Sequence, residues 1–192
     1  MARIEDGKGS GKNAEVDAQN RLQTHAVSEA ESLHHAEVGN GYNINTGLIS
    51  ITADATLIYL KNNEDTDFVI TSIALGSFEG IIHSDDPYVT LVRNPTGGDL
   101  ISDATAVSMN QNRNFGSNLT PTIDVYKGKV GGTVTGGNDI AILQATPGGR
   151  SFYSIDFVLP RGTSLGVKLT ANITSGTANW YCALIGYVKE AE

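Results

Sequence analysis

The residues best suited to chemistry near the N-terminus lie in segment 7–12, which reads Gly-Lys-Gly-Ser-Gly-Lys. This segment is similar to a phosphate-binding loop, but such a loop needs one more residue between its glycines, a Ser or Thr after the lysine, and a preceding strand. Asn13 follows Lys12, and no strand pattern precedes Gly7. The sequence therefore predicts no nucleotide site; Lys8 and Lys12 could instead contact an acidic partner surface.

A histidine pair is the next candidate, because His34 and His35 lie close to Glu31 and Glu37. Imidazole and carboxylate groups can bind zinc, but adjacent residues on a helix point about 100° apart. The fixed spacing of a structural zinc site is also missing. The sequence predicts surface or interface histidines here, without a metal.

Two acidic clusters could bind calcium only if separate loops converged in space: Glu64, Asp65 and Asp67, and His83 with Asp85 and Asp86. Turn formation explains both clusters without a cation, since Asp and Asn favour turns and no calcium-loop motif is present. We therefore expect no metal and no cofactor.

Hydrolytic chemistry has no recognisable motif, and no serine has the Gly-x-Ser-x-Gly surroundings of a nucleophile. The four histidines are His25, His34, His35 and His83. The best acidic candidate, Asp156, reads as an edge or outward-facing strand residue. The sequence predicts a protein that is not an enzyme.

Composition narrows the class of partner. The 192 residues include 13 basic and 21 acidic side chains, which give a net charge of -8. Nucleic-acid binding needs clustered Lys and Arg, so it is not expected. No run reaches the roughly 18 apolar residues of a membrane span, and no signal sequence is evident, so we expect a soluble protein made in a cytoplasm. The one cysteine, Cys182, reads as a buried small apolar residue.

The amino-acid composition changes at Gly39-Asn40-Gly41, from a polar segment to short β-type runs. Residues 1–40 are polar and predict an extended N-terminal arm. Within it, segment 28–38 predicts a short helix, because Ser28 followed by Glu31 forms a capping-box pattern. Residues 41–192 predict a separate β domain.

Short β-type runs separated by Gly, Asn, Asp and Pro turns fill that domain, without an amphipathic helix between them. We expect strands at 44–51 (bent around a turn), 55–60, 68–75, 88–93, 123–126, 140–145, 151–159, 165–170 and 180–188. The spacing predicts an all-β antiparallel sandwich or jelly roll. The short polar loop 61–67 predicts a hairpin between its flanking strands, and 180–188, apolar on both faces, predicts a central strand.

A long loop is expected at 104–118, where apolar residues are sparse. Its asparagines at 110, 112 and 114 predict side-chain to backbone hydrogen bonds that order the loop.

Three segments, 14–22, 37–47 and 59–65, resemble those of small structural proteins of tailed bacteriophages. In that group a β domain decorates, or cements, the outside of the capsid. The resemblance implies a virion protein on the capsid surface that binds the major capsid protein, commonly as a trimer or dimer.

The arm would supply the attachment, through apolar residues spaced along it. These residues are Val16, Leu22, Val27, Leu33 and Val38. Each fully buried aliphatic side chain contributes about 1.5 to 3 kcal/mol, so several together offset the entropy of ordering an arm.

Two other functions remain open at this point. The chain could be a different virion component, such as a head fibre base, a tail protein or a baseplate protein. It could also be a carbohydrate-binding β-sandwich module, which would require exposed aromatic side chains on one face or loop.

Overall fold

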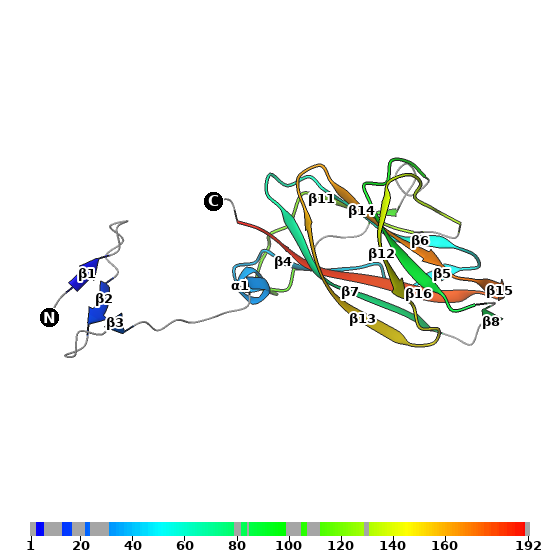
Figure 1. Cartoon of the computed structure of the whole chain (residues 1–192), viewed down its shortest axis with the longest axis horizontal. Coiled ribbons are helices and arrows are strands. Elements are labelled where there is room, and N and C mark those ends of the chain that lie inside the picture. Colours follow the sequence, from blue (N-terminus) through cyan, green and yellow to red (C-terminus); the bar gives the residue numbers. More distant parts are fainter. Residues whose placement is uncertain are drawn as a thin grey trace. The chain divides into compact units, whose positions relative to one another are not determined.

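The computed structural model shows an all-β protein, with one short helix among the residues that it describes (Figure 1). The chain divides into two compact units, Met1–Ala30 and Glu31–Glu192. The structure describes residues 3–5, 13–16, 22–23, 31–78, 82–83, 85–98, 105–106, 112–128 and 131–190.

The first unit contains a small antiparallel sheet. Its strands, in the order in which they pair, are β1 (Arg3–Glu5), β2 (Asn13–Val16) and β3 (Leu22–Gln23). The register pairs Arg3 with Glu15 and Ile4 with Ala14. Segment 7–12 and Ser28 lie outside the described residues.

The second unit begins with helix α1 (Glu31–Glu37), which lies inside the predicted range 28–38. The helix contacts strands of the β domain, so the unit that holds the β domain starts at Glu31 and not at Gly41. Residues 31–40 thus belong with this unit.

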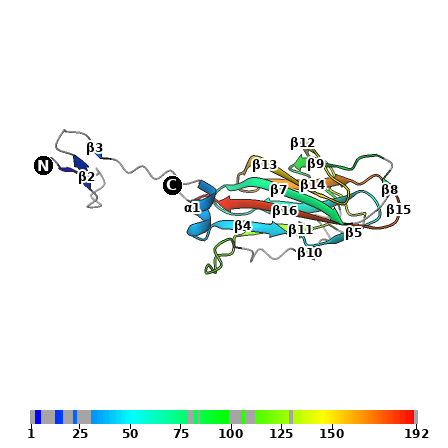
Figure 2. The same ribbon diagram turned by 90° about the horizontal axis from the view of Figure 1, so that it is seen from below.

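Two antiparallel sheets make up the body of this unit (Figures 1 and 2). The first sheet runs β10 (Thr105–Ala106), β11 (Ile123–Lys127), β6 (Ala55–Asn62), β14 (Ser164–Thr170), β9 (Tyr88–Arg93) and β12 (Asn138–Gln144). The second runs β13 (Arg150–Leu159), β7 (Phe68–Phe78), β16 (Ala178–Val188) and β4 (Gly41–Asn45), with β5 (Ile49–Ile51) also on β16. A separate pair joins β15 (Ile173–Ser175) to β8 (Ile82–His83).

The core lies between these sheets. Ile58 and Leu91 of the first sheet and Ile70 and Leu184 of the second are fully buried in a single apolar cluster. Two sheets that bury their facing side chains in this way form a β-sandwich. The predicted all-β antiparallel sandwich is confirmed, and so is the central position of the closing strand, β16, between β7 and β4.

The predicted hairpin of β6 and β7 is wrong, because the two strands belong to different sheets. β6 pairs with β11 and β14, whereas β7 pairs with β13 and β16. The loop between them is a corner that crosses from one sheet to the other. Both strands are largely buried, so their backbone N–H and C=O groups need hydrogen-bond partners on both sides. Each strand finds these partners in two neighbouring strands.

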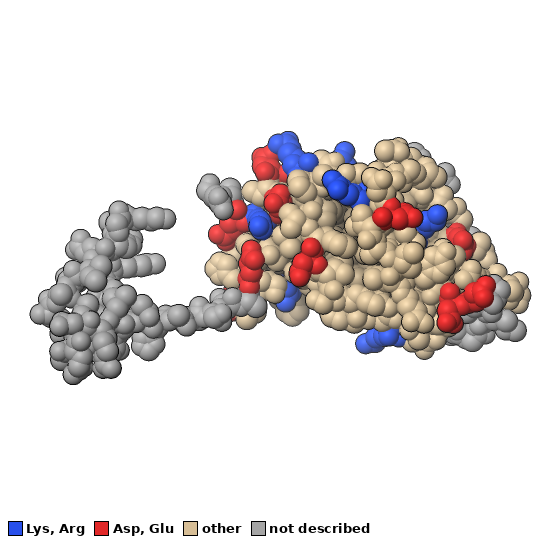
Figure 3. All heavy atoms as spheres, in the orientation of Figure 1, with Lys and Arg blue, Asp and Glu red and all other residues tan. Residues whose placement is uncertain are grey.

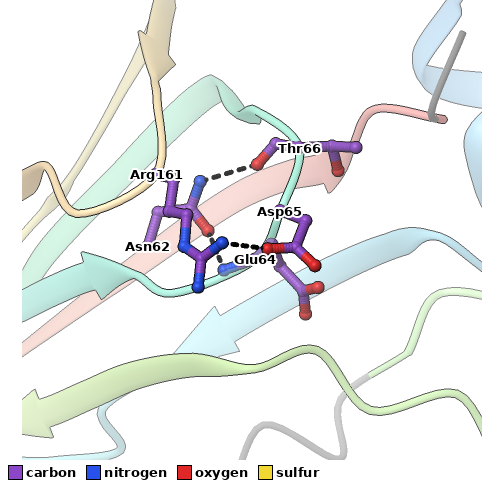
Figure 4. A network of polar contacts seen from close by, with 5 residues as sticks. All are labelled: Asn62, Glu64, Asp65, Thr66 and Arg161. Atoms are coloured by element: carbon purple, nitrogen blue, oxygen red, sulfur yellow. Dashed lines mark hydrogen bonds and ion pairs between the residues drawn. The ribbon is translucent and has the colours of Figure 1, made fainter.

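Asn62 holds this corner from inside (Figure 4). Its side chain is fully buried, and its Nδ2 donates to the carbonyls of Thr66 at 2.9 Å and Leu159 at 2.8 Å. Its Oδ1 accepts a hydrogen bond from the Glu64 backbone at 2.9 Å. Outside the corner, an ion pair joins Arg161 to Asp65.

The described part of the chain has no helix with the length and apolar character that a membrane span requires.

Candidate attachment surface

Helix α1 is fixed to the sandwich by one buried aromatic contact. The imidazole of His35 stacks on the ring of Tyr187, with ring centroids 4.3 Å apart and planes 10° apart. His35 is buried, and its Nε2 lies 3.8 Å from Glu31 Oε1. His34 faces outward, so the two histidines diverge as adjacent helical residues must.

A glycine permits the close approach of the helix to β4. A Cβ built on Gly41 would lie 2.9 Å from the Cα of Ala36, which is closer than real Cβ atoms come to a backbone atom. The Gly41 that the sequence marked as part of a break therefore lets α1 pack directly on the sheet.

Loop 112–119 is pinned against the end of α1 by asparagine side chains. Asn112 Nδ2 donates to the Gly39 carbonyl at 2.5 Å, and Asn114 Nδ2 donates to the Glu37 carbonyl at 2.7 Å. These bonds satisfy carbonyls that the end of a helix leaves without intrahelical partners. The predicted side-chain to backbone bonding is confirmed for these two residues; Asn110 lies outside the described residues.

Arg113 adds two further bonds from the same loop. Its backbone N–H donates to the Gly41 carbonyl at 2.8 Å, and its Nη1 donates to the Ser32 carbonyl at 3.3 Å. The loop, the helix and the edge strand β4 are thereby joined into one ordered surface.

Large apolar side chains are exposed on this surface. Leu33 and Val38 are 47% and 44% exposed, Leu119 is 51% exposed, and Phe115 is exposed completely. Leu33 and Phe115 line the same open hollow of about 370 Å³, together with Arg113. We call Leu33, Val38, Phe115 and Leu119 the helix-end patch. Exposed apolar groups on an ordered surface are typical of an interaction site.

The five predicted attachment residues fall into three groups. Leu33 and Val38 are exposed and belong to the helix-end patch. Val16 and Leu22 lie on β2 and β3 of the first unit. Val27 lies outside the described residues. The role of all five in attachment stays a prediction.

Neither Phe115 nor Leu119 was predicted as a contact residue: Phe115 falls in the ordered loop expected at 104–118, and Leu119 lies just after it. A signal was present, since a phenylalanine between Asn114 and Gly116 in a polar loop has no core to enter. An apolar residue in an ordered polar loop is a candidate for contact with a partner.

The residues first considered for chemistry are not gathered into a reactive centre in the described part of the chain. No group of three or more His, Cys, Asp or Glu side chains is placed to hold a metal among these residues. Cys182 is fully buried, as predicted, and burial raises the pKa of its thiol. Asp156 is exposed on the edge strand β13, also as predicted.

A second hollow lies on the outer face of the other end of the sheet. Phe78 is 50% exposed, and its ring centroid lies 6.1 Å from that of Tyr181, with the planes tilted by 38°. Both rings and the side chain of Arg150 line an open hollow of about 430 Å³. A Cβ on Gly76 would lie 2.3 Å from Tyr181 Cε1, so the tyrosine ring lies directly over the glycine.

A scan against protein-family models finds no family that matches this chain, and a search of curated protein sequences finds no match either.

Proposed function

We propose that this chain is a structural virion protein that binds the outside of a bacteriophage capsid and stabilises it. The N-terminal unit, residues 1–30, and the helix-end patch together make the attachment to the major capsid protein. No catalytic step is required, and the protein acts as a homo-oligomer on the shell.

The observation that carries this proposal is the position of the helix-end patch in the chain. Helix α1 directly follows residues 1–30 in the chain, and its exposed Leu33 lines one hollow with the exposed Phe115. Because residues 1–30 and the patch belong to consecutive parts of one chain, a single partner that binds both adds their contributions. Burial of one large apolar side chain stabilises such a contact by about 1.5 to 3 kcal/mol.

Strand order gives independent support. In chain order, β4, β6, β7 and β9 alternate between the second and first sheets, and β12, β13, β14 and β16 alternate between the first and second, while β11 is added to the first sheet beside β6. This arrangement is the one expected of a jelly roll, a fold used by many capsid proteins.

The test mixes purified protein with empty shells of the major capsid protein and measures co-sedimentation, appearance by microscopy, and the heat resistance of the shells. The full chain should coat the shells and raise their melting temperature. A chain that begins at Glu31 keeps the compact second unit but lacks the contacts of residues 1–30. It should bind at least about tenfold more weakly, which corresponds to a loss of about 1.4 kcal/mol of binding free energy.

Paired variants test the patch itself. Phe115→Ser should weaken shell binding without changing the melting temperature of the free protein, because Phe115 is fully exposed. Leu48→Ser removes a comparable exposed side chain from the loop between β4 and β5 and serves as the control. Full binding by both the truncated chain and the Phe115 variant would exclude the proposed attachment.

The aromatic hollow favours carbohydrate binding as a second candidate function. A sugar ring can stack on an open aromatic face while a guanidinium such as that of Arg150 bonds its hydroxyls. Glycan-array binding that is lost in Tyr181→Ala but kept in Tyr88→Ala would support this function.

A further inference from the structure

The two edges of the second sheet are treated differently. The β4 edge is covered by loop 112–119. Tyr42 forms a β-bridge with Asn112, and the Gly41 carbonyl accepts a hydrogen bond from the backbone N–H of Arg113. The opposite edge is β13, a strand of ten residues, and no described strand pairs with its outer side. A long unpaired edge offers a row of backbone donors and acceptors to another chain.

β13 is held in position by β12, the edge strand of the first sheet. β12 ends the first sheet on this side, and the hydroxyl of Tyr153 donates to the carbonyl of Gln144 at the end of β12. Figures 1 and 2 show the two edge strands on the same side of the sandwich. The bare edge is therefore held in a fixed position.

Exposure alternates along β13, so that even-numbered residues from 150 to 158 face outward. Phe152 is 64% exposed and Val158 is 51% exposed. The sandwich face in Figure 3 has a broad uncharged area at its centre, with most charged side chains towards its margins. The outer side of β13 thus combines a free edge with apolar side chains.

Two charges on this edge make it complementary to itself. Arg150 lies three residues before Tyr153, and Asp156 lies three residues after it. Within the described part of the chain, neither charged group has an ion-pair partner. Charges on an edge strand normally oppose pairing, because they would lose hydration or face like charges on an incoming strand. Opposite charges at equal distances from one centre instead fit a second copy in antiparallel orientation.

We propose that two copies of this chain pair through the outer edges of their β13 strands, antiparallel about Tyr153, so that Arg150 of each copy faces Asp156 of the other. The register shift between Ser154 and Phe157 places Ile155 and Asp156 of β13 opposite the single Thr71 of β7, but exposure along β13 still alternates through this segment, so Arg150 and Asp156 stay on the same face. The dimer joins the two second sheets into one continuous sheet and brings both Phe152 side chains to the interface. This inference rests on the homo-oligomeric part of the proposed function and specifies its surface.

Sedimentation velocity and light scattering on the free full-length protein, from about 1 to 200 µM, test this dimer without any shell. The wild type should be a dimer at the upper concentrations. Arg150→Glu and Asp156→Arg should each weaken dimerisation at least about tenfold, because each places two like-charged pairs at the interface. Lys189→Glu and Asp124→Arg make the same charge changes at exposed sites elsewhere and should have no effect.

The decisive sample is an equimolar mixture of the Arg150→Glu and Asp156→Arg proteins. In the mixed dimer both facing pairs again carry opposite charges, so the mixture should dimerise within about threefold of the wild type. A monomeric or trimeric wild type, or a mixture that stays monomeric, would overturn the proposed pairing. Since no shell is present, this failure would leave shell binding to be decided by its own experiment.

Discussion

The imidazole ring of His35 lies flat against the phenol ring of Tyr187, with 4.3 Å between ring centroids. His35 belongs to the first element of the second unit and Tyr187 to its last long strand. This contact therefore joins α1, which follows residue 30 in the chain, to the central strand of the second sheet. The stability of the helix-end patch depends on this contact.

We expect His35→Ala to lower the free energy of unfolding by about 2 to 3 kcal/mol, because it removes a buried ring and leaves a cavity. Glu37→Ala, at an exposed position of the same helix, should change it by less than about 0.5 kcal/mol. Urea unfolding followed by fluorescence measures both. Equal effects of the two substitutions would contradict the packing of α1.

His35→Phe should leave the protein at least as stable as the wild type. Nδ1 of His35 is buried and has no hydrogen-bond partner among the described residues. A phenyl ring keeps the stacking on Tyr187 and removes this unpaired polar atom, whose burial costs about 1 to 3 kcal/mol. The same unfolding measurement decides it, and a loss as large as that of His35→Ala would show that the ring nitrogens are needed.

Stability should fall between about pH 10 and pH 12, and Tyr187 should account for part of the fall, at most about 2 to 3 kcal/mol. Burial, followed by the hydrogen bond to the Glu31 carboxylate and its charge, raises the pKa of Tyr187 from 10.0 to about 12. Above pH 10 the unfolded state loses this proton while the folded state keeps it, so unfolding becomes more favourable as pH rises.

Tyr187→Phe should make the stability of the protein less dependent on pH over that interval. Tyr88→Phe changes a partly exposed tyrosine and should keep the wild-type dependence. Denaturant unfolding at several alkaline pH values gives the difference. Parallel curves for the wild type and the Tyr187 variant would refute the assignment.

Asn62→Ala should destabilise the fold by about 2 to 4 kcal/mol, because it leaves buried backbone groups of the corner without partners. Asn62→Asp should be worse at neutral pH, since it points a carboxylate at the carbonyls of Thr66 and Leu159. Asn63→Ala, at the neighbouring position, is the control. Thermal unfolding should rank the variants in this order, and a neutral Asn62→Ala would remove Asn62 from its role at the corner.

The strands could be predicted from the sequence because burial follows a period of two along most of them. Their pairing could not, as the loop between β6 and β7 shows. A short polar loop is compatible with a hairpin and also with a corner between sheets. The corner is stabilised by the hydrogen bond from Asn62 to the carbonyl of Leu159, a residue distant in the sequence. Local sequence patterns do not reveal such a contact.

The surface was predictable only in part for a similar reason. Leu33 and Val38 stood out because they are apolar residues in a polar segment. Phe115 became a neighbour of Leu33 only through the bonds that Asn112 and Asn114 form with the end of α1. The asparagine-rich composition predicted that such bonds exist, but not which carbonyls would accept them.

Cys182 should resist thiol reagents in the native protein and react fully after denaturation. It is completely buried in the core, and burial raises the pKa of the thiol, so very little nucleophilic thiolate forms at neutral pH. Labelling with an aromatic disulfide reagent, with and without denaturant, measures both states. Rapid stoichiometric labelling of the native protein would show that the core opens far more often than this packing allows.

Asn112→Ala should loosen loop 112–119 while changing global stability by only about 1 kcal/mol. The side chain of Asn112 donates to the Gly39 carbonyl, and its Oδ1 accepts a bond from the Asn114 backbone at 2.8 Å, so the substitution releases both the loop and its contact with the helix end. Hydrogen exchange of the loop amides should accelerate, whereas amides of β16 should stay protected. Shell binding should weaken together with the loop, because Phe115 then has to be ordered on binding. Asn118→Ala, whose side chain makes no bond among the described residues, should change neither exchange nor binding.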